Sequence, residues 1–273
     1  MLGKFLENVK NTRPIVHNIT NYVTVNGCAN ILLACGSSPI MADDAEEAEE
    51  IVAISSGLNI NIGTLNKNTI LSMLKAGKKA NELGRPVLLD PVGAGASKLR
   101  TETAFKLIDE IKFDVIRGNI SEIKTLAFGV GTTRGVDADV TDMITEETLD
   151  NTVSFAKKTA EKTGCVVVIT GAIDIVADRE KAVCVRNGHP MMERITGAGC
   201  QLSAMTAAYI AANKENIFYA AVAAVCAMGI CGEKAFLRMG KLDGNASYGN
   251  YIIDAVYNLN PDELERCAKY EMR

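Results

Sequence analysis

The sequence predicts an α/β protein with a mainly parallel central sheet and helices on both faces, in one domain over residues 1–273. Short apolar runs alternate along the chain with longer helical stretches, which is the order that parallel strands joined by crossover helices require. The runs are rich in β-branched residues, as expected of strands buried on both faces. No linker rich in Pro, Gly or Ser divides the chain, and it shows no repeat of roughly 20–50 residues.

The apolar, β-branched runs are predicted to be strands because each is short and ends at polar or glycine residues. These runs are residues 85–90, 114–117, 165–170 and 181–185. Residues 58–62 (LNINI) instead alternate apolar and polar side chains, which predicts an edge strand.

The stretches between these runs are predicted to be helices, at residues 66–83, 101–111, 121–128 and 145–162. The last is expected to begin at Thr145, because Glu146 and Glu147 then lie in the first turn, where the helix dipole favours acidic residues. The C-terminal third is predicted to be helical at residues 200–212, 217–237, 249–258 and 262–270. Ligands of such sheets bind beyond the carboxyl ends of the strands, so polar residues there are the candidates for a site.

Composition narrows the functional classes. The chain has 29 Lys and Arg against 33 Asp and Glu, so its net charge of −4 argues against general nucleic-acid binding. No pair among its eight cysteines has C-x-x-C spacing, which argues against a zinc ribbon or a thioredoxin-type site. The cysteines are expected to be small buried residues. The N-terminal residues lack the apolar core of a leader peptide, so a cytoplasmic location is expected.

Other classes are disfavoured by what the sequence lacks. Residues 217–232 are uncharged but fall short of the ~20 residues of a membrane span, so a buried helix without membrane contact is expected. There is no G-x-x-x-x-G-K-[ST] loop, and residues 129–134 lack the third glycine of a dinucleotide-binding turn. The two histidines, His17 and His189, are far apart in sequence, which argues against a His-metal site or a Ser-His-Asp triad.

The strongest local motif is Arg194-Ile-Thr-Gly-Ala-Gly-Cys200, directly before a helix of small residues. Gly197 and Gly199 leave backbone N–H groups free to converge on an anion, and the helix dipole adds positive potential. A phosphoryl group in transfer is one suitable guest. Cys200 falls in the first turn, where we expect its thiol pKa below the free value of about 8.5. A glycine turn that only begins a helix would look the same.

Further candidates follow the predicted strands. Arg117 could pair with a phosphate, and Glu122 could hold Mg²⁺ directly or through water. Asp90, before a glycine-rich stretch, is a candidate carboxylate for a metal or a water molecule. Thr170, followed by glycine, could bond a nucleotide phosphate. Ordinary strand ends and helix starts would carry the same residues, so both interpretations stay open.

Two residues near the N-terminus suggest a small polar aromatic ligand. Asn21 lies among apolar residues and needs a polar partner if it is buried, and Met41 would form a soft apolar wall. Helix capping and core packing would account for them equally well.

Taken together, these segments resemble a known family. An N-x-x-E motif at residues 119–122, followed much later by a Gly-Ala-Gly turn, resembles the ribokinase-like superfamily of small-molecule kinases. The N-terminal segments NITNYVTVN, ANILLACG and SPIMA, with residues 89–96, 116–122 and 196–200, resemble the hydroxyethylthiazole kinase family. The resemblance covers roughly residues 13–260 in the same order. It implies a ribokinase-like three-layer sandwich.

The resemblance also implies roles for the candidate residues on the acceptor side. Met41 and Gly197 match thiazole-contacting positions, and Asn21 lies in the same pocket segment. Cys200 takes the place of the general base, where most of the superfamily carries Asp and the thiazole kinases carry Cys. Gly197, Ala198 and Gly199 match the anion hole.

On the nucleotide side, Arg117 and Thr170 match ATP-binding positions, and Asp90 and Glu122 match the acidic residues around Mg²⁺. The family implies phosphorylation of the primary hydroxyl of 4-methyl-5-(2-hydroxyethyl)thiazole by ATP in thiamine salvage. It also implies a homotrimer with sites between adjacent subunits. Two alternatives stay open: a related kinase acting on a hydroxymethylpyrimidine or pyridoxal, and a non-catalytic sensor of a thiazole or nucleotide.

Overall fold

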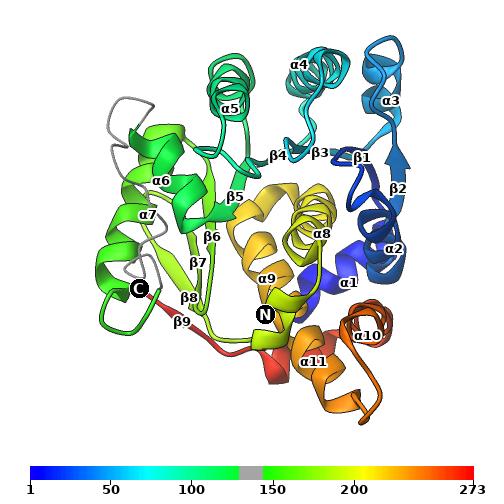
Figure 1. Ribbon diagram of the computed structural model, residues 1–273, viewed down its shortest axis with the longest axis vertical. Coiled ribbons are helices and arrows are strands. Elements are labelled where there is room, and N and C mark those ends of the chain that lie inside the picture. The colour runs from blue at the N-terminus through cyan, green and yellow to red at the C-terminus, as the bar shows by residue number, and fades with distance from the viewer. Residues whose placement is uncertain (129–143) are drawn as a thin grey trace.

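The computed structural model describes residues 1–128 and 144–273, and the incomplete glycine motif at 129–134 lies outside the described residues. Within these residues, nine strands form one sheet in the order β2-β1-β3-β4-β5-β6-β7-β8-β9 (Figure 1). The strands are β1 (Ile15–Ile19), β2 (Ser38–Met41), β3 (Gly57–Asn61), β4 (Val87–Asp90), β5 (Val115–Asn119), β6 (Val166–Thr170), β7 (Asp174–Ala177), β8 (Ala182–Val185) and β9 (Tyr270–Met272).

The sheet is mainly parallel, as predicted. Neighbouring strands are parallel from β2 to β6, and antiparallel from β6 through β7 and β8 to β9. The register pairs Asn61 with Asp90 and Asn119 with Thr170. The carboxyl ends of β3 to β6 therefore bring their polar residues to one edge of the sheet.

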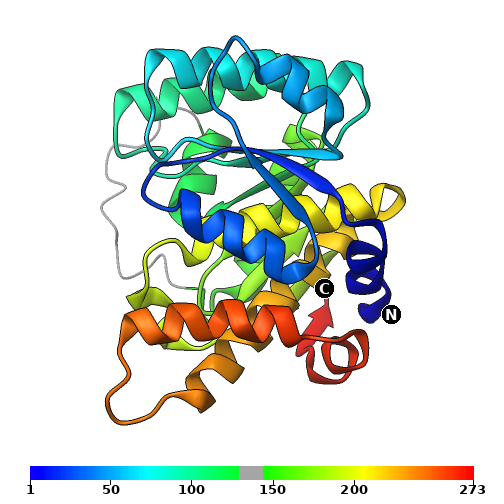
Figure 2. The ribbon, with the colours of Figure 1, turned by 90° about the vertical axis from the view of Figure 1, so that its right-hand side faces the viewer.

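Helices cover both faces, which confirms the three-layer architecture. One layer holds α3 (Ala48–Ile54), α4 (Lys67–Glu82), α5 (Lys98–Glu110), α6 (Ile120–Phe128) and α7 (Leu149–Thr163). The other holds α1 (Gly3–Thr12), α2 (Val25–Cys35), α8 (Ala198–Ala212), α9 (Ile217–Arg238), α10 (Asn245–Asn258) and α11 (Pro261–Cys267). Figures 1 and 2 show α4 and α5 on one side of the sheet and α10 on the opposite side.

Each face of the sheet has its own apolar core. In β6, Val166 and Val168 pack into the core under α8 and α9, whereas Val167 and Ile169 pack into the core under α7. Because both faces are buried, such a strand is apolar at every position rather than at alternate ones. This is why the sequence identified β4, β5, β6 and β8.

The prediction that residues 58–62 form an edge strand is wrong. Strand β3 lies between β1 and β4, and all five of its residues are buried. Leu58 and Ile60 pack in one core, while Asn59 and Asn61 point to the other face and bond buried polar partners. The alternation reflects an internal polar layer rather than a face in water.

Several helix ends also differ from the prediction. Helix α7 begins at Leu149 rather than Thr145, because residues 146–148 form a turn in which the Thr148 hydroxyl accepts the Thr145 N–H at 2.9 Å. Helix α5 begins at Lys98, capped by the Ser97 hydroxyl. The helix predicted at 262–270 ends at Cys267, and the chain continues as β9 along the edge of β8.

The buried-helix and cysteine predictions are confirmed. The segment Lys214–Arg238 is long and apolar enough to cross a membrane by length and composition, but 78% of its most apolar window is buried inside the protein. All eight cysteines are free, and all but the partly exposed Cys267 are buried.

Candidate active site

The N-terminus of α8 reaches the carboxyl edge of the sheet through two glycines. Gly197 is the residue before the helix and has φ 87°, a left-handed conformation that glycine adopts without strain. A Cβ on Gly199 would lie 2.7 Å from the guanidinium nitrogens of Arg117. The first glycine therefore allows the turn, and the second allows Arg117 to lie directly against the backbone.

Cys200 is buried in the first turn of α8 and is held by two amides. Its Sγ accepts hydrogen bonds from Nδ2 of Asn21 at 3.3 Å and from Nδ2 of Asn61 at 3.2 Å. The Asn21 amide also donates to Oδ1 of Asn61 at 2.9 Å, and its own Oδ1 accepts the Thr24 hydroxyl at 3.0 Å. Two candidates that the sequence analysis named separately, Asn21 and Cys200, are therefore in direct contact.

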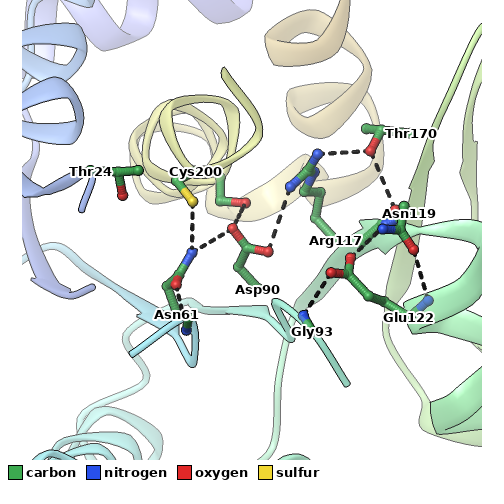
Figure 3. A network of polar contacts seen from close by, with 12 residues as sticks. Thr24, Asn61, Asp90, Gly93, Arg117, Asn119, Glu122, Thr170 and Cys200 are labelled. Carbon is green, nitrogen blue, oxygen red and sulfur yellow. Dashed lines mark hydrogen bonds and ion pairs between the residues drawn. The ribbon is translucent and has the colours of Figure 1, made fainter. Parts of the chain in front are cut away.

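Asp90, the last residue of β4, links this cluster to the nucleotide side. Its side chain is fully buried, and Oδ2 accepts hydrogen bonds from Asn61 at 2.7 Å and from the Ser203 hydroxyl at 2.8 Å. Oδ1 lies 3.5 Å from Nη1 of Arg117 and accepts no hydrogen bond from the described residues. Figure 3 shows the resulting chain from Cys200 through Asn61 and Asp90 to Arg117.

Arg117, in the middle of β5, and Thr170, at the end of β6, are in direct contact. Nη2 of Arg117 donates to the Thr170 hydroxyl at 2.7 Å (Figure 3). Both line a cavity of about 520 Å³, which the Gly197–Gly199 turn also lines. The far wall is apolar, from Val225 and Met228 of α9. The arrangement offers a cation, a hydroxyl and free backbone N–H groups to an anion, beside an apolar recess.

Glu122 is tied to the backbone at the start of α6. Its Oε2 accepts the Asn119 N–H, and the Asn119 side chain accepts the Glu122 N–H, both at 2.8 Å. This reciprocal pair is a capping box. Oε1 also accepts the Gly93 N–H at 2.8 Å, which joins the loop after β4 to α6 (Figure 3). The interpretation of Glu122 as a helix-start residue is thus correct, and a carboxylate can still accept further contacts.

The two carboxylates fit a shared Mg²⁺. Burial raises the pKa of Asp90, the Arg117 guanidinium opposes this rise and the charge of Glu122 adds to it, and the resulting pKa is about 6. The two carboxylates act on each other electrostatically, and Oδ1 of Asp90 faces the Arg117 guanidinium without a hydrogen bond, so it can still accept a second cation. Among the described residues no group of three or more His, Cys, Asp or Glu forms a metal cage. Mg²⁺ usually binds one or two carboxylates together with substrate phosphates and water, so this set suffices.

The expected lowering of the Cys200 pKa is wrong. Burial raises the pKa of the thiol above its ordinary value, and the charge of Asp90 raises it further. The hydrogen bonds from Thr24, Asn21 and Asn61 oppose this rise without cancelling it. Desolvation and a neighbouring anion therefore outweigh the helix dipole, and Cys200 is a neutral thiol at neutral pH.

Met41 lies outside the polar network of Figure 3. It ends the edge strand β2 beside Asn18 and packs against the core that contains Cys200, and its contact with an acceptor stays a prediction. Conversely, Asn61 and Ser203 were missed although both bond Asp90. Ser203 lies three residues after Cys200, on the same helix face. This spacing on α8 and the asparagines of β3 are the sequence features from which Ser203 and Asn61 could have been predicted.

Comparisons with known proteins show the family of this chain. A sequence model of the hydroxyethylthiazole kinase family matches residues 6–262. The chain belongs to the hydroxyethylthiazole kinase family. A hydroxyethylthiazole kinase of Clostridium acetobutylicum is 66% identical over 271 residues, which cover 99% of each chain. Another from Clostridium beijerinckii is 50% identical, covering 98% of this chain and 96% of that one.

Solved structures of two other kinases have a similar fold. The hydroxyethylthiazole kinase of Pyrococcus horikoshii matches with a TM-score of 0.88 and 36% identity, covering 100% of this chain and 98% of that one. A pyridoxal kinase of Staphylococcus aureus, solved with AMP-PCP and pyridoxal, matches with a TM-score of 0.60 at 15% identity, covering 95% and 98%. The second likeness concerns the fold alone, and together they confirm the ribokinase-like architecture expected of a hydroxyethylthiazole kinase.

Proposed function

We propose that the chain is an ATP- and Mg²⁺-dependent kinase that phosphorylates the primary hydroxyl of 4-methyl-5-(2-hydroxyethyl)thiazole in thiamine salvage, as a single domain over residues 1–273. The observation that carries the proposal is the continuous network from Cys200 through Asp90 and Arg117 to Thr170, which links the acceptor side to the 520 Å³ cavity. Family membership supports the choice of acceptor.

The chemistry follows from where the charges lie. ATP occupies the cavity, with its phosphates on Arg117, Thr170 and the Gly197–Gly199 turn. The acceptor lies beside Asn21 and Met41, with its hydroxyl at Cys200. The hydroxyl oxygen attacks the γ-phosphorus, the bond to the bridging β–γ oxygen breaks, and ADP leaves, while the hydroxyl proton passes to an oxygen of the transferred phosphoryl group and from there to solvent. In a loose transition state the developing negative charge rests mainly on phosphoryl oxygens, which the α8 N-terminus and Arg117 stabilise.

Mg²⁺, when bound, neutralises phosphate charge and orients the β- and γ-phosphates. Asp90 and Glu122 would hold it, Asp90 through Oδ1 and Glu122 directly or through water. Asn61, Ser203 and the Gly93 and Asn119 N–H groups keep the two carboxylates in place.

Cys200 occupies the general-base position as a neutral thiol, so it acts chiefly by placing the hydroxyl. Cys200→Ala is expected to lower kcat roughly ten- to a hundredfold, less than the loss of a working general base can cost. The KM for the thiazole alcohol should stay within about threefold, because the mutation removes a contact to the reacting hydroxyl and leaves the rest of the acceptor pocket. Steady-state kinetics at saturating ATP measure both.

Cys35→Ala is the matched control, since Cys35 is also buried but lies in α2, outside the network. It should cost stability without changing the rate. Cys200→Asp supplies the carboxylate base of the superfamily and should keep at least the wild-type rate if it folds. An equal rise in KM and fall in kcat for Cys200→Ala would contradict the assignment.

Glu122→Gln is expected to raise the Mg²⁺ concentration for half-maximal activity about tenfold, because one of two carboxylates loses its charge. A Mg²⁺ titration at fixed ATP measures this. Asn119→Ala removes the reciprocal capping bond but keeps the carboxylate, so it should cost about 1 kcal/mol of stability and leave the titration unchanged. If both variants shift the Mg²⁺ requirement equally, Glu122 acts only through the helix start.

We further propose a homotrimer in the cytoplasm, with acceptor sites between subunits. Beside Asn21, the side chains of Tyr22 and Val23 are 78% and 59% exposed, so the acceptor side presents apolar surface that a second copy would cover. The mass in solution tests this part.

The decisive experiment is transfer of radiolabel from [γ-³²P]ATP to the thiazole alcohol, with Mg²⁺ present. Absence of transfer from a folded protein of the expected mass would overturn the proposal. A panel with hydroxymethylpyrimidine and pyridoxal separates the related kinases, and any turnover excludes a pure sensor.

A further inference from the structure

Asp174 is a carboxylate in the nucleotide cavity that the proposed reaction does not use. It begins β7 and lines the cavity together with Arg117 and Thr170. Its Oδ1 accepts the Gly171 N–H at 3.0 Å, so it braces the turn that follows Thr170. A carboxylate facing a cavity built for phosphates is repelled by them unless its charge is neutralised.

The surroundings of Asp174 leave its charge only partly compensated. Burial raises its pKa to about 7, against the Gly171 N–H and the charge of Arg117 from β5. From α9 it faces Cys226, whose pKa is raised to about 12 by burial and then by Asp174. Arg186, Glu193 and His189 line the same cavity. Arg186 is held by Glu146 and Glu271, and the His189 ring stacks on Phe236 and accepts the Met191 N–H at Nδ1. The Gly171 N–H and, to a smaller extent, the charge of Arg117 therefore limit the rise in the pKa of Asp174.

We propose that binding of the ATP phosphates is coupled to uptake of one proton by Asp174, an inference that rests on the proposed function. The phosphates pair with Arg117, and this pairing removes the part of the compensation that Arg117 gives Asp174 in the free protein. The phosphates also add negative charge to the same cavity. Both changes favour the neutral carboxyl, which can still accept the Gly171 N–H through its carbonyl oxygen.

The sign of the pH dependence follows. Since the complex holds more protons than the free protein, nucleotide affinity falls as the pH rises through the pKa of Asp174, which is about 7 in the free protein. If the complex titrates about one pH unit higher, affinity should weaken roughly sixfold from pH 6.5 to 8.5. At pH 7.5, binding should take up roughly half a proton per nucleotide.

Isothermal titration calorimetry tests this with Mg·ADP, which binds without turnover. The binding enthalpy is measured at pH 7.5 in buffers of different ionisation enthalpy. The slope of binding enthalpy against buffer ionisation enthalpy gives the number of protons taken up. Asp174→Asn keeps an acceptor for the Gly171 N–H but cannot titrate, and should reduce the uptake to near zero. Asp178→Asn makes the same change at the far end of the β7–β8 hairpin, where Asp178 caps the turn, and should keep wild-type uptake.

The outcomes are distinct. Phosphate groups titrate near pH ~6, so their share is small at pH 7.5 and is common to every variant. Nucleotide binding without proton uptake by the wild type overturns the inference and leaves the proposed function intact, even if Asp174→Asn fails to fold. Equal uptake by wild type and Asp174→Asn also overturns it. No binding of Mg·ADP would overturn the proposed function itself.

Discussion

Arg117→Ala is expected to lower kcat/KM for phosphoryl transfer about a thousandfold, which corresponds to about 4 kcal/mol of transition-state stabilisation. Arg117 is the buried cation that touches both Asp90 and Thr170, and it lies against the Gly197–Gly199 turn where the transferred group is expected. In such an enclosed site a preorganised charge acts strongly on the anionic transition state. Initial-rate kinetics with varied ATP and thiazole alcohol measure the loss.

The same substitution changes the pH dependence of stability. The pKa of Asp90 is already raised from 3.8 to about 6, so the folded protein binds more protons than the unfolded chain between these values, and stability falls as pH rises through this window. Without Arg117 the pKa rises further, and the loss of stability extends above pH 6. Chemical unfolding at pH 5 and pH 8 should reveal a larger difference for the variant than for wild type.

Arg117→Lys separates the two effects. A lysine keeps a positive charge near Asp90 but lacks the planar fork that reaches Asp90 and Thr170 together. It should restore most of the stability at pH 8 and little of the rate. Activity of Arg117→Ala within tenfold of wild type would show that Arg117 is structural and would remove it from the mechanism.

The sequence predicted those site residues that follow recognisable strands. Asp90 and Thr170 end β4 and β6, and Arg117 lies in β5, three strands that are apolar because both faces are buried. Topology then places their ends side by side. The glycine turn before α8 could also be predicted from the sequence, because the positive φ at Gly197 is a local requirement that glycine meets without strain.

What the sequence could not predict depends on distant contacts. Asn61 was missed because β3 alternates like an edge strand, and only the packing of α8 shows that its polar face is buried. The rise in the Cys200 pKa has the same origin, since Asp90 is far away in sequence but acts on the thiol in the fold. The sequence around Cys200 shows the helix dipole, which lowers the thiol pKa, but it does not show the burial that raises it.

Asp90→Asn is expected to lower kcat about a thousandfold while changing the free energy of unfolding by less than about 2 kcal/mol. The asparagine oxygen can still accept hydrogen bonds from Asn61 and Ser203, so the local packing is kept. Its charge is lost, and with it a proposed Mg²⁺ ligand and the partner of Arg117. The cost of leaving Arg117 unpaired is offset in part because removing a buried carboxylate also removes its desolvation penalty.

Ser203→Ala is the matched control for Asp90→Asn, because it deletes one hydrogen bond to Asp90 and leaves the charge. It should cost about 1 kcal/mol of stability and less than tenfold in rate. Rate measurements at saturating Mg²⁺, with unfolding followed between pH 4 and pH 7, distinguish the roles. A catalytic carboxylate predicts loss of rate together with loss of the pH dependence between the unfolded pKa of 3.8 and the folded pKa of about 6. A structural one predicts loss of that pH dependence alone.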